Sequence, residues 1–145
     1  MDFELEISPS GKINLAKDIT RVTVLFFYPR DNTSGCTIEN LDFTHLYPEF
    51  KQANVDLYGV SRDTLRSHCN FISKQNLSVP LIADPEETLC NFFGVMKDKK
   101  MYGKDVRGIE RSTFVLDSKG SIIHEWRKVK VDNHARLVLD YIKSL

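Results

Sequence analysis

A nearly unbroken apolar run of seven residues most limits how this chain can fold. It reads Val22-Thr23-Val24-Leu25-Phe26-Phe27-Tyr28 and is followed at once by the polar stretch Pro29-Arg30-Asp31-Asn32-Thr33-Ser34-Gly35. A short apolar run that stops at turn-forming residues is typical of a fully buried strand. The run therefore indicates a sheet that has packing on both faces.

The rest of the chain alternates predicted strands with predicted helices, which favours an α/β fold in which helices cover a mixed sheet. The predicted strands are residues 3–7, 13–15, 22–28, 56–60, 81–83, 113–117 and 122–126. The first predicted helix runs from 36 to 52, and the second ends at 75 with Ser61 or Asp63 as its N-cap. The third runs from 84 to about 94 with Asp84 as its N-cap. The last helix starts at Asn133, its N-cap. Residues 97–104 are predicted to form an exposed loop. A length of 145 residues is expected for one domain, residues 1–145.

Composition excludes several classes of function. Lys plus Arg and Asp plus Glu both number 20, so no net positive charge draws the chain to nucleic acid or to a membrane surface. The acidic start Met1-Asp2-Phe3-Glu4 does not resemble a signal peptide, and no apolar stretch approaches the length of about 20 residues that spans a membrane. Three cysteines, an odd number, argue against a secreted disulfide framework, so we expect a cytoplasmic protein.

Cys36 lies where a thiol is expected to be reactive. It falls in the first turn of a predicted helix, just beyond the end of the buried strand, with Ile38 and Leu41 starting the helical apolar spacing. Free backbone N–H groups and the helix dipole favour an anion at such a place, and the thiolate is the nucleophilic form of cysteine. Thr33 offers a hydroxyl nearby, and Gly35 allows the backbone to approach a ligand. This chemistry needs neither a metal nor an organic cofactor.

The motif Pro29-x-x-x-Thr33-x-x-Cys36 resembles the active-site signature of the peroxiredoxins. The longer string from Phe27 to Thr37 is similar to the bacterioferritin-comigratory-protein (PrxQ) subfamily. Further matching segments are Gly59-Val60-Ser61-Arg62-Asp63, Pro80-Leu81-Ile82-Ala83-Asp84 and residues 108–117, which read Gly-Ile-Glu-Arg-Ser-Thr-Phe-Val-Leu-Asp. Because the segments are ordered along the whole chain, the resemblance is specific.

The resemblance implies a thioredoxin-like fold with an added N-terminal β-hairpin, and an antioxidant enzyme that reduces hydrogen peroxide and organic hydroperoxides. Cys36 would be the peroxidatic nucleophile and pass through a sulfenic acid. Arg111 would stabilise the thiolate and orient the peroxide, with Pro29, Thr33 and Gly35 completing the pocket. Thioredoxin or a glutaredoxin-type thiol would be the reductant, and many relatives are monomers. The alternative is a redox sensor that turns over slowly.

The residue that resolves the sulfenic acid is left open. One type in this subfamily has a resolving cysteine five residues after the nucleophile, where this chain has Leu41, and another has it at the position that aligns with Ile72. Cys69 lies one helical turn before Ile72 and is a possible resolving residue, although bridging would require local unfolding. The alternative is a one-cysteine enzyme reduced directly by an external thiol. Cys90 is expected in the core, and the four histidines show no metal-binding spacing.

Overall fold

The apolar run forms β3 (Thr23–Phe27), an inner strand of a seven-stranded mixed sheet. The computed structural model describes the backbone of residues 1–145 and the side chains of all of them except residue 101. β3 pairs in parallel with β4 and antiparallel with β8. Across the sheet the strand order is β2 (Lys12–Ile13), β1 (Leu5–Ile7), β5 (Leu81–Ala83), β4 (Asp56–Ser61), β3, β8 (Ser112–Leu116) and β9 (Ile122–Trp126).

Successive residues of β3 point to opposite faces of the sheet, and both faces are covered. Val24 and Phe26 pack into one apolar cluster together with Phe43, and Leu25 and Phe27 pack into a second cluster. All five residues are fully buried. The prediction of a strand buried on both sides is confirmed, and so is the predicted α/β architecture.

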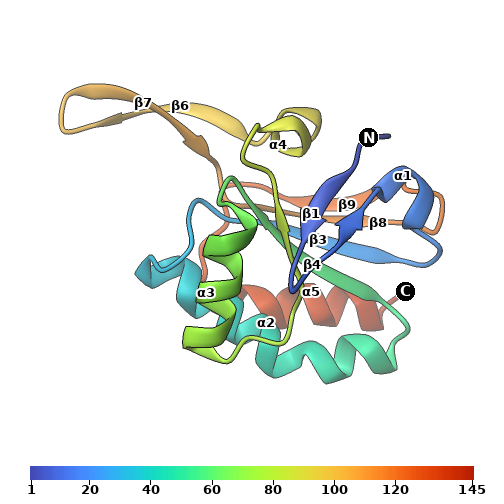
Figure 1. Cartoon of the computed structure of the whole chain (residues 1–145). Coiled ribbons are helices and arrows are strands. Elements are labelled where there is room, and N and C mark those ends of the chain that lie inside the picture. The colour runs from blue at the N-terminus through green and yellow to red at the C-terminus, as the bar shows by residue number, and fades with distance from the viewer.

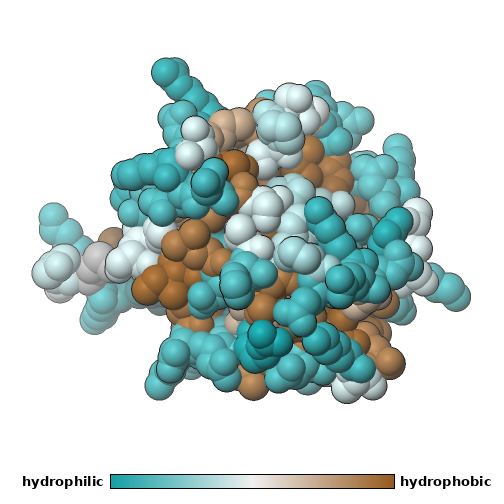
Figure 2. Space-filling model, turned by 90° about the horizontal axis from the view of Figure 1, so that it is seen from below, coloured by the Kyte–Doolittle hydropathy of each residue, from teal (hydrophilic) through white to brown (hydrophobic). Residues whose placement is uncertain are grey.

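Five helices surround the sheet (Figure 1), and they are α1 (Leu15–Asp18), α2 (Ser34–Gln52), α3 (Leu65–Gln75), α4 (Thr88–Phe92) and α5 (His134–Lys143). α2, α3 and α5 contribute to the first apolar cluster, whereas α1 and α4 contribute to the second, on the opposite face. The face that carries α2 and α5 shows separate apolar patches between polar side chains (Figure 2). Among the described residues, no helix has the length and apolar character needed to cross a bilayer.

Residues 97–104 do not form the loop that the sequence predicts. They belong to a two-stranded antiparallel hairpin, β6 (Met96–Met101) and β7 (Lys104–Ile109), which projects from the body of the molecule (Figure 1). The hairpin turns at Tyr102 and Gly103, both of which have positive φ angles. Its side chains are mostly exposed, so the strands have no apolar alternation for a pattern-based prediction to detect.

Two predicted helix caps were wrong. Thr64, rather than Ser61 or Asp63, is the N-cap of α3, and its hydroxyl accepts a hydrogen bond from the N–H of Ser67. α4 begins at Thr88 with Glu87 as N-cap, rather than at Asp84. The Asp84 carboxylate nevertheless accepts hydrogen bonds from the N–H groups of the first turn of α4, at Leu89 (3.1 Å) and Cys90 (2.8 Å). Asp84 therefore stabilises the start of the helix from outside it.

Candidate active site around Cys36

Cys36 is the third residue of α2 and lies at the carboxyl-end edge of the sheet, after β3. Thr33 is the N-cap of the helix. The N–H groups of the first turn of a helix lack partners within the helix and carry partial positive charge. The thiol itself is only 1% exposed and belongs to the apolar cluster under α2. A buried sulfur at a helix start has electrostatic support for an anion and little competition from water.

Arg111 brings a positive charge to this sulfur. It lies between β7 and β8, and its Nη2 is 3.5 Å from the Sγ of Cys36. Its Nη1 donates a hydrogen bond of 2.6 Å to Oε1 of Glu39, which is itself buried. One guanidinium therefore contacts the thiol and a buried carboxylate through two different nitrogens, a geometry that a lysine cannot reproduce.

The Arg111–Glu39 pair is strongly perturbed by its surroundings. Burial raises the pKa of Glu39 to about 7, against the opposing attraction of Arg111. Burial alone would lower the pKa of Arg111, but the attraction of Glu39 and Cys36 outweighs it and raises that pKa. Oε2 of Glu39 has no hydrogen-bond partner among the described residues. The charge of the Glu39 carboxyl group thus depends on pH near neutrality, and this group is hydrogen-bonded directly to Arg111.

Gly35 and Pro29 shape the space around the thiol. A methyl group on Gly35 would lie 3.3 Å from Nη2 of Arg111, so a larger residue there would push the guanidinium back by a few tenths of an ångström. Pro29 and Arg111 line a surface pocket of about 370 Å³ together with Lys99, Glu110, Lys128 and Val129. The pocket gives a small molecule a place to bind beside the arginine.

Thr33 makes a different contact from the one expected of a cap. Its hydroxyl donates to the carbonyl of Arg30 at 2.9 Å and does not cap the helix. Its own carbonyl accepts from the N–H (2.9 Å) and the hydroxyl (2.7 Å) of Thr37. Thr33 thus fixes the turn that leads into α2, while its side chain is exposed.

The first turns of α2 differ from the predicted apolar spacing, whereas Leu46 and Phe50, which continue that spacing, are buried as predicted. Ile38 and Leu41, which the apolar spacing placed on the buried side, are 52% and 39% exposed. Glu39 and Asn40 are buried in their place, and Nδ2 of Asn40 donates to the carbonyl of Cys36 at 2.9 Å. A polar inward face in the turn that carries Cys36 is unfavourable for packing, and its presence there is explained by the contact with Arg111. Sequence reasoning missed Glu39, although its spacing of three residues from Cys36 places both on one helical face.

The structure separates the other two cysteines from this pocket. All three cysteines are free. Cys69 lies on α3, half-buried, and its Sγ is 3.5 Å from the carbonyl of Pro9 in the turn between β1 and β2. Cys90 is fully buried in the second apolar cluster, where burial and then the neighbouring Asp84 carboxylate raise the pKa of its thiol well above the ordinary value. The prediction that Cys90 belongs to the core is confirmed.

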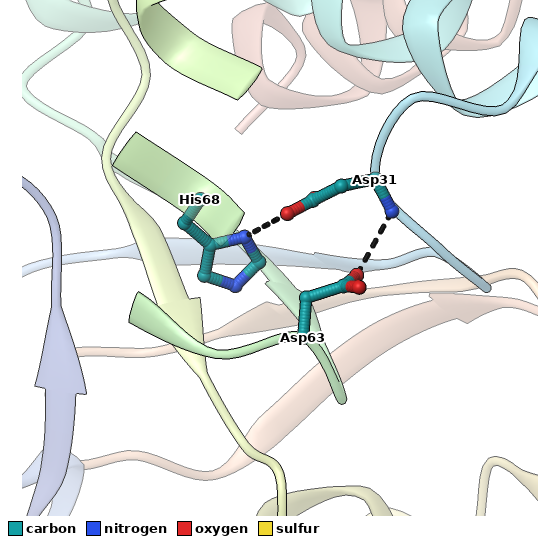
Figure 3. A group of neighbouring side chains, drawn as sticks. All are labelled: Asp31, Asp63 and His68. Carbon is teal, nitrogen blue, oxygen red and sulfur yellow. Dashed lines mark hydrogen bonds and ion pairs between the residues drawn. The ribbon is translucent and has the colours of Figure 1, made fainter. Parts of the chain in front are cut away.

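A second polar cluster lies beside the loop between β3 and α2. Asp31, Asp63 and His68 each place one ligand-type atom within 4.8 Å of the others (Figure 3). The spacing of the histidines in the sequence gave no sign of such a group. The carboxylates and the imidazole are already hydrogen-bonded, to one another and to neighbouring groups, as described below.

Comparison with known proteins gives consistent matches. The AhpC/TSA family model matches residues 1–125. Peroxiredoxin Bcp of Xanthomonas campestris is 49% identical over 98% of this chain and 90% of its own length, and Peroxiredoxin Bcp of Bacillus subtilis is 40% identical over 99% and 92%. A solved structure of Xanthomonas campestris Peroxiredoxin Q superposes with a TM-score of 0.94 at 48% identity, covering 99% of this chain and 90% of that one. A second structure from that organism, described in terms of the alkyl peroxide reduction activity of its bacterioferritin comigratory protein, gives 0.93 at 47% identity, covering 99% and 91%.

Proposed function

The chain belongs to the AhpC/TSA family, and within it to the Bcp/PrxQ peroxiredoxins, and we propose that Cys36 performs the thiol peroxidase reaction of this family. The protein is accordingly a thiol peroxidase with a thioredoxin-like fold. The observation that carries the assignment of the site is the contact of Arg111 with the Cys36 sulfur at the start of α2. A sensor with slow turnover is not favoured.

In the first step, the Cys36 thiolate attacks the distal oxygen of a hydroperoxide. The S–O bond forms while the O–O bond breaks, and the leaving oxygen departs as water or an alcohol after it takes up a proton. Arg111 stabilises the negative charge on sulfur before the attack and on the leaving oxygen during it. We expect the pocket lined by Pro29 and Arg111 to admit the peroxide, and the N–H groups of Gly35 and Cys36, in the first turn of α2, to act as its donors.

In the second step, we assign Cys69 as the resolving thiol. Its sulfur displaces water from the Cys36 sulfenic acid and a disulfide forms, which a dithiol donor of the thioredoxin or glutaredoxin type reduces back to two thiols while becoming oxidised itself. The position of Cys69 on α3 supports this assignment, but its sulfur faces Pro9, so the first turns of α3 must open. Direct reduction of the sulfenic acid by an external thiol is the competing route.

We infer three further properties of this chain. The chain acts as a single domain, because one sheet and its two apolar clusters extend over the sequence from Leu5 to Ile142. It acts as a monomer, which light scattering of the reduced protein would test. It works in the cytoplasm, in keeping with three free cysteines.

The decisive experiment treats reduced protein with one equivalent of hydrogen peroxide and measures the intact mass, followed by peptide mapping. Loss of two hydrogens with Cys36 joined to Cys69 would support the two-cysteine cycle. One added oxygen on Cys36, equal in the wild type and in Cys69→Ser, would assign the reduction to an external thiol. Peroxide consumption that survives in Cys36→Ser would remove Cys36 from the reaction.

A further inference from the structure

His68 is completely buried, and both of its ring nitrogens face oxygen atoms. Nδ1 is 2.8 Å from Oδ2 of Asp31, and Nε2 is 2.9 Å from the carbonyl oxygen of Ile82 on β5. A carbonyl oxygen can only accept, so Nε2 must carry a proton. A second proton must lie between Nδ1 and the carboxyl group.

The surroundings of Asp31 place that second proton on the ring. Oδ1 of Asp31 accepts from the hydroxyl of Tyr28 at 2.6 Å, and Oδ2 is 2.8 Å from the hydroxyl of Ser67. With two hydroxyl groups and the imidazole around it, the carboxyl group is placed to accept three hydrogen bonds, which suits the ionised form. The pair is then an imidazolium and a carboxylate, shielded from water.

The two partners come from different parts of the active-site region (Figure 3). Asp31 lies in the loop between β3 and α2, five residues before Cys36, and His68 lies on α3 directly before Cys69. The loop is also held through its backbone, because the N–H of Asp31 donates to Oδ2 of Asp63 at 2.8 Å. Asp63 in turn accepts from the hydroxyl of Ser61 at 2.6 Å.

We propose that the His68–Asp31 ion pair is a latch that makes the order of the loop at residues 29–36 and the folding of the first turns of α3 depend on each other. His68 and Asp31 are positioning residues in this reading, since neither contacts the Cys36 sulfur. The close approach of Asp31, Asp63 and His68 serves this latch, because their facing atoms already bond within the cluster.

The latch has a consequence for catalysis that rests on the proposed roles of Cys36 and Cys69. Moving Cys69 toward Cys36 requires the turn that carries His68 to open, which separates His68 from Asp31. The loop then loses its side-chain anchor on α3. Peroxide capture needs an ordered loop and therefore the closed His68–Asp31 pair. Resolution by Cys69 needs the same pair to be open.

The first test concerns the protonation of His68 in the reduced wild-type protein at neutral pH. Nitrogen-15 NMR of histidine-labelled protein, with the His68 signals assigned by their loss in His68→Asn, reports whether each ring nitrogen carries a proton. We expect protons on both Nδ1 and Nε2. A His68 ring nitrogen without a proton would overturn the ion pair, whatever the enzymatic activity of the protein.

The second test measures hydrogen exchange in reduced His68→Asn and Asp31→Asn. Removing one partner of a buried ion pair is strongly destabilising, so we expect exchange in both variants to rise by about tenfold or more at the first turns of α3 and at residues 29–37 together. Ser67→Ala, which removes one hydroxyl from Asp31 and keeps both charges, should give a smaller rise in the same two segments. His124→Asn is the matched control, because His124 is exposed on β9 and stacks on Tyr141.

Three outcomes would contradict the latch. A rise in α3 without a rise in the loop, or the reverse, would show that the segments are independent. An equal rise throughout the sheet would show that the pair stabilises the fold as a whole. A similar rise in His124→Asn would show that the effect is not specific to His68. Because the test measures exchange in the resting protein and no peroxide is consumed, its result does not depend on the peroxidase assignment.

Discussion

Replacing Glu39 by Gln should lower the rate at which Cys36 reacts with peroxide, and should do so only above about neutral pH. Gln has the shape of Glu and can still accept a hydrogen bond from Nη1 of Arg111 through its carbonyl oxygen. The substitution therefore removes the charge that holds the guanidinium beside the sulfur and leaves the packing of α2 in place. It reproduces the protonated form of Glu39.

The size of the effect follows from the hydrogen bond of 2.6 Å between Arg111 and Glu39. In the variant the charged guanidinium still donates a hydrogen bond, so what is lost is the attraction between the two opposite charges; we take about 1.4 kcal/mol, the lower part of the about 1–4 kcal/mol expected for unit charges about 4 Å apart. If the transition state for the attack loses this amount of stabilisation because Arg111 is held less firmly, the second-order rate constant for the reaction with peroxide falls about tenfold. Since the pKa of Glu39 is raised to about 7, wild-type protein should show the advantage only where Glu39 is ionised.

The assay is the ratio of the wild-type to the Glu39→Gln rate constant, measured by competition for hydrogen peroxide across a range of pH. We expect a ratio near one at about pH 5.5 and about ten at about pH 8.5, with the midpoint near the pKa of Glu39.

Glu49→Gln is the matched control, because Glu49 lies on the same helix and pairs with Lys143 and Arg136. A ratio that stays constant with pH would refute the role assigned to the Glu39 charge. A ratio that changes equally for Glu49→Gln would show that the effect is general to α2.

Three further predictions concern the neighbours of this pair. Arg111→Lys keeps the positive charge but loses the guanidinium fork that contacts Glu39 and Cys36 together, so oxidation of Cys36 by peroxide should slow by about tenfold or more. Arg111→Ala should slow the oxidation further. A Lys variant as fast as the wild type would show that charge alone suffices. Gly35→Ala should slow the same reaction several-fold with little change in melting temperature, because the new methyl group would lie 3.3 Å from Nη2 of Arg111; an unchanged rate would contradict the need for close approach. Burial, and then repulsion by Arg111, lowers the pKa of His134 from 6.5 to about 4. Between these two pH values His134 binds a proton in the unfolded chain but not in the native protein. The free energy of unfolding therefore falls as the pH falls. Denaturant unfolding should show this loss, about 2–3 kcal/mol by pH ~4.5, in wild type and much less of it in His134→Gln; equal losses would refute the assignment.

The sequence predicted the frame of the site well, because the frame depends on local signals. The predicted run 22–28 contains the buried strand Thr23–Phe27, and Cys36 follows in the first turn of a helix. β8 and β9 form where strands are predicted at residues 113–117 and 122–126, and they pair antiparallel. In each of these segments, hydrophobic pattern and turn chemistry indicate the same structure.

The parts that could not be predicted depend on contacts between distant residues. Glu39 and Arg111 are 72 positions apart, and although the spacing places Glu39 on the face of Cys36, only the contact with Arg111 explains why a carboxylate is buried there. The inward face of α2 was assigned to Ile38 and Leu41 because apolar residues are normally buried, a rule that the active-site carboxylate reverses here. The pairing of His68 with Asp31 is likewise visible only after α3 has been placed against the loop.

The projecting hairpin of β6 and β7 begins and ends at one place in the fold. The N–H of Glu110 donates to the carbonyl of Val95 at 2.7 Å, so the chain leaves the body at Val95 and returns to the same backbone group directly before Arg111. Relative to Arg111, the hairpin is an excursion that starts and ends at this one hydrogen-bonded pair. Its tip can gain, lose or exchange residues while the anchor that sets Arg111 against Cys36 stays fixed.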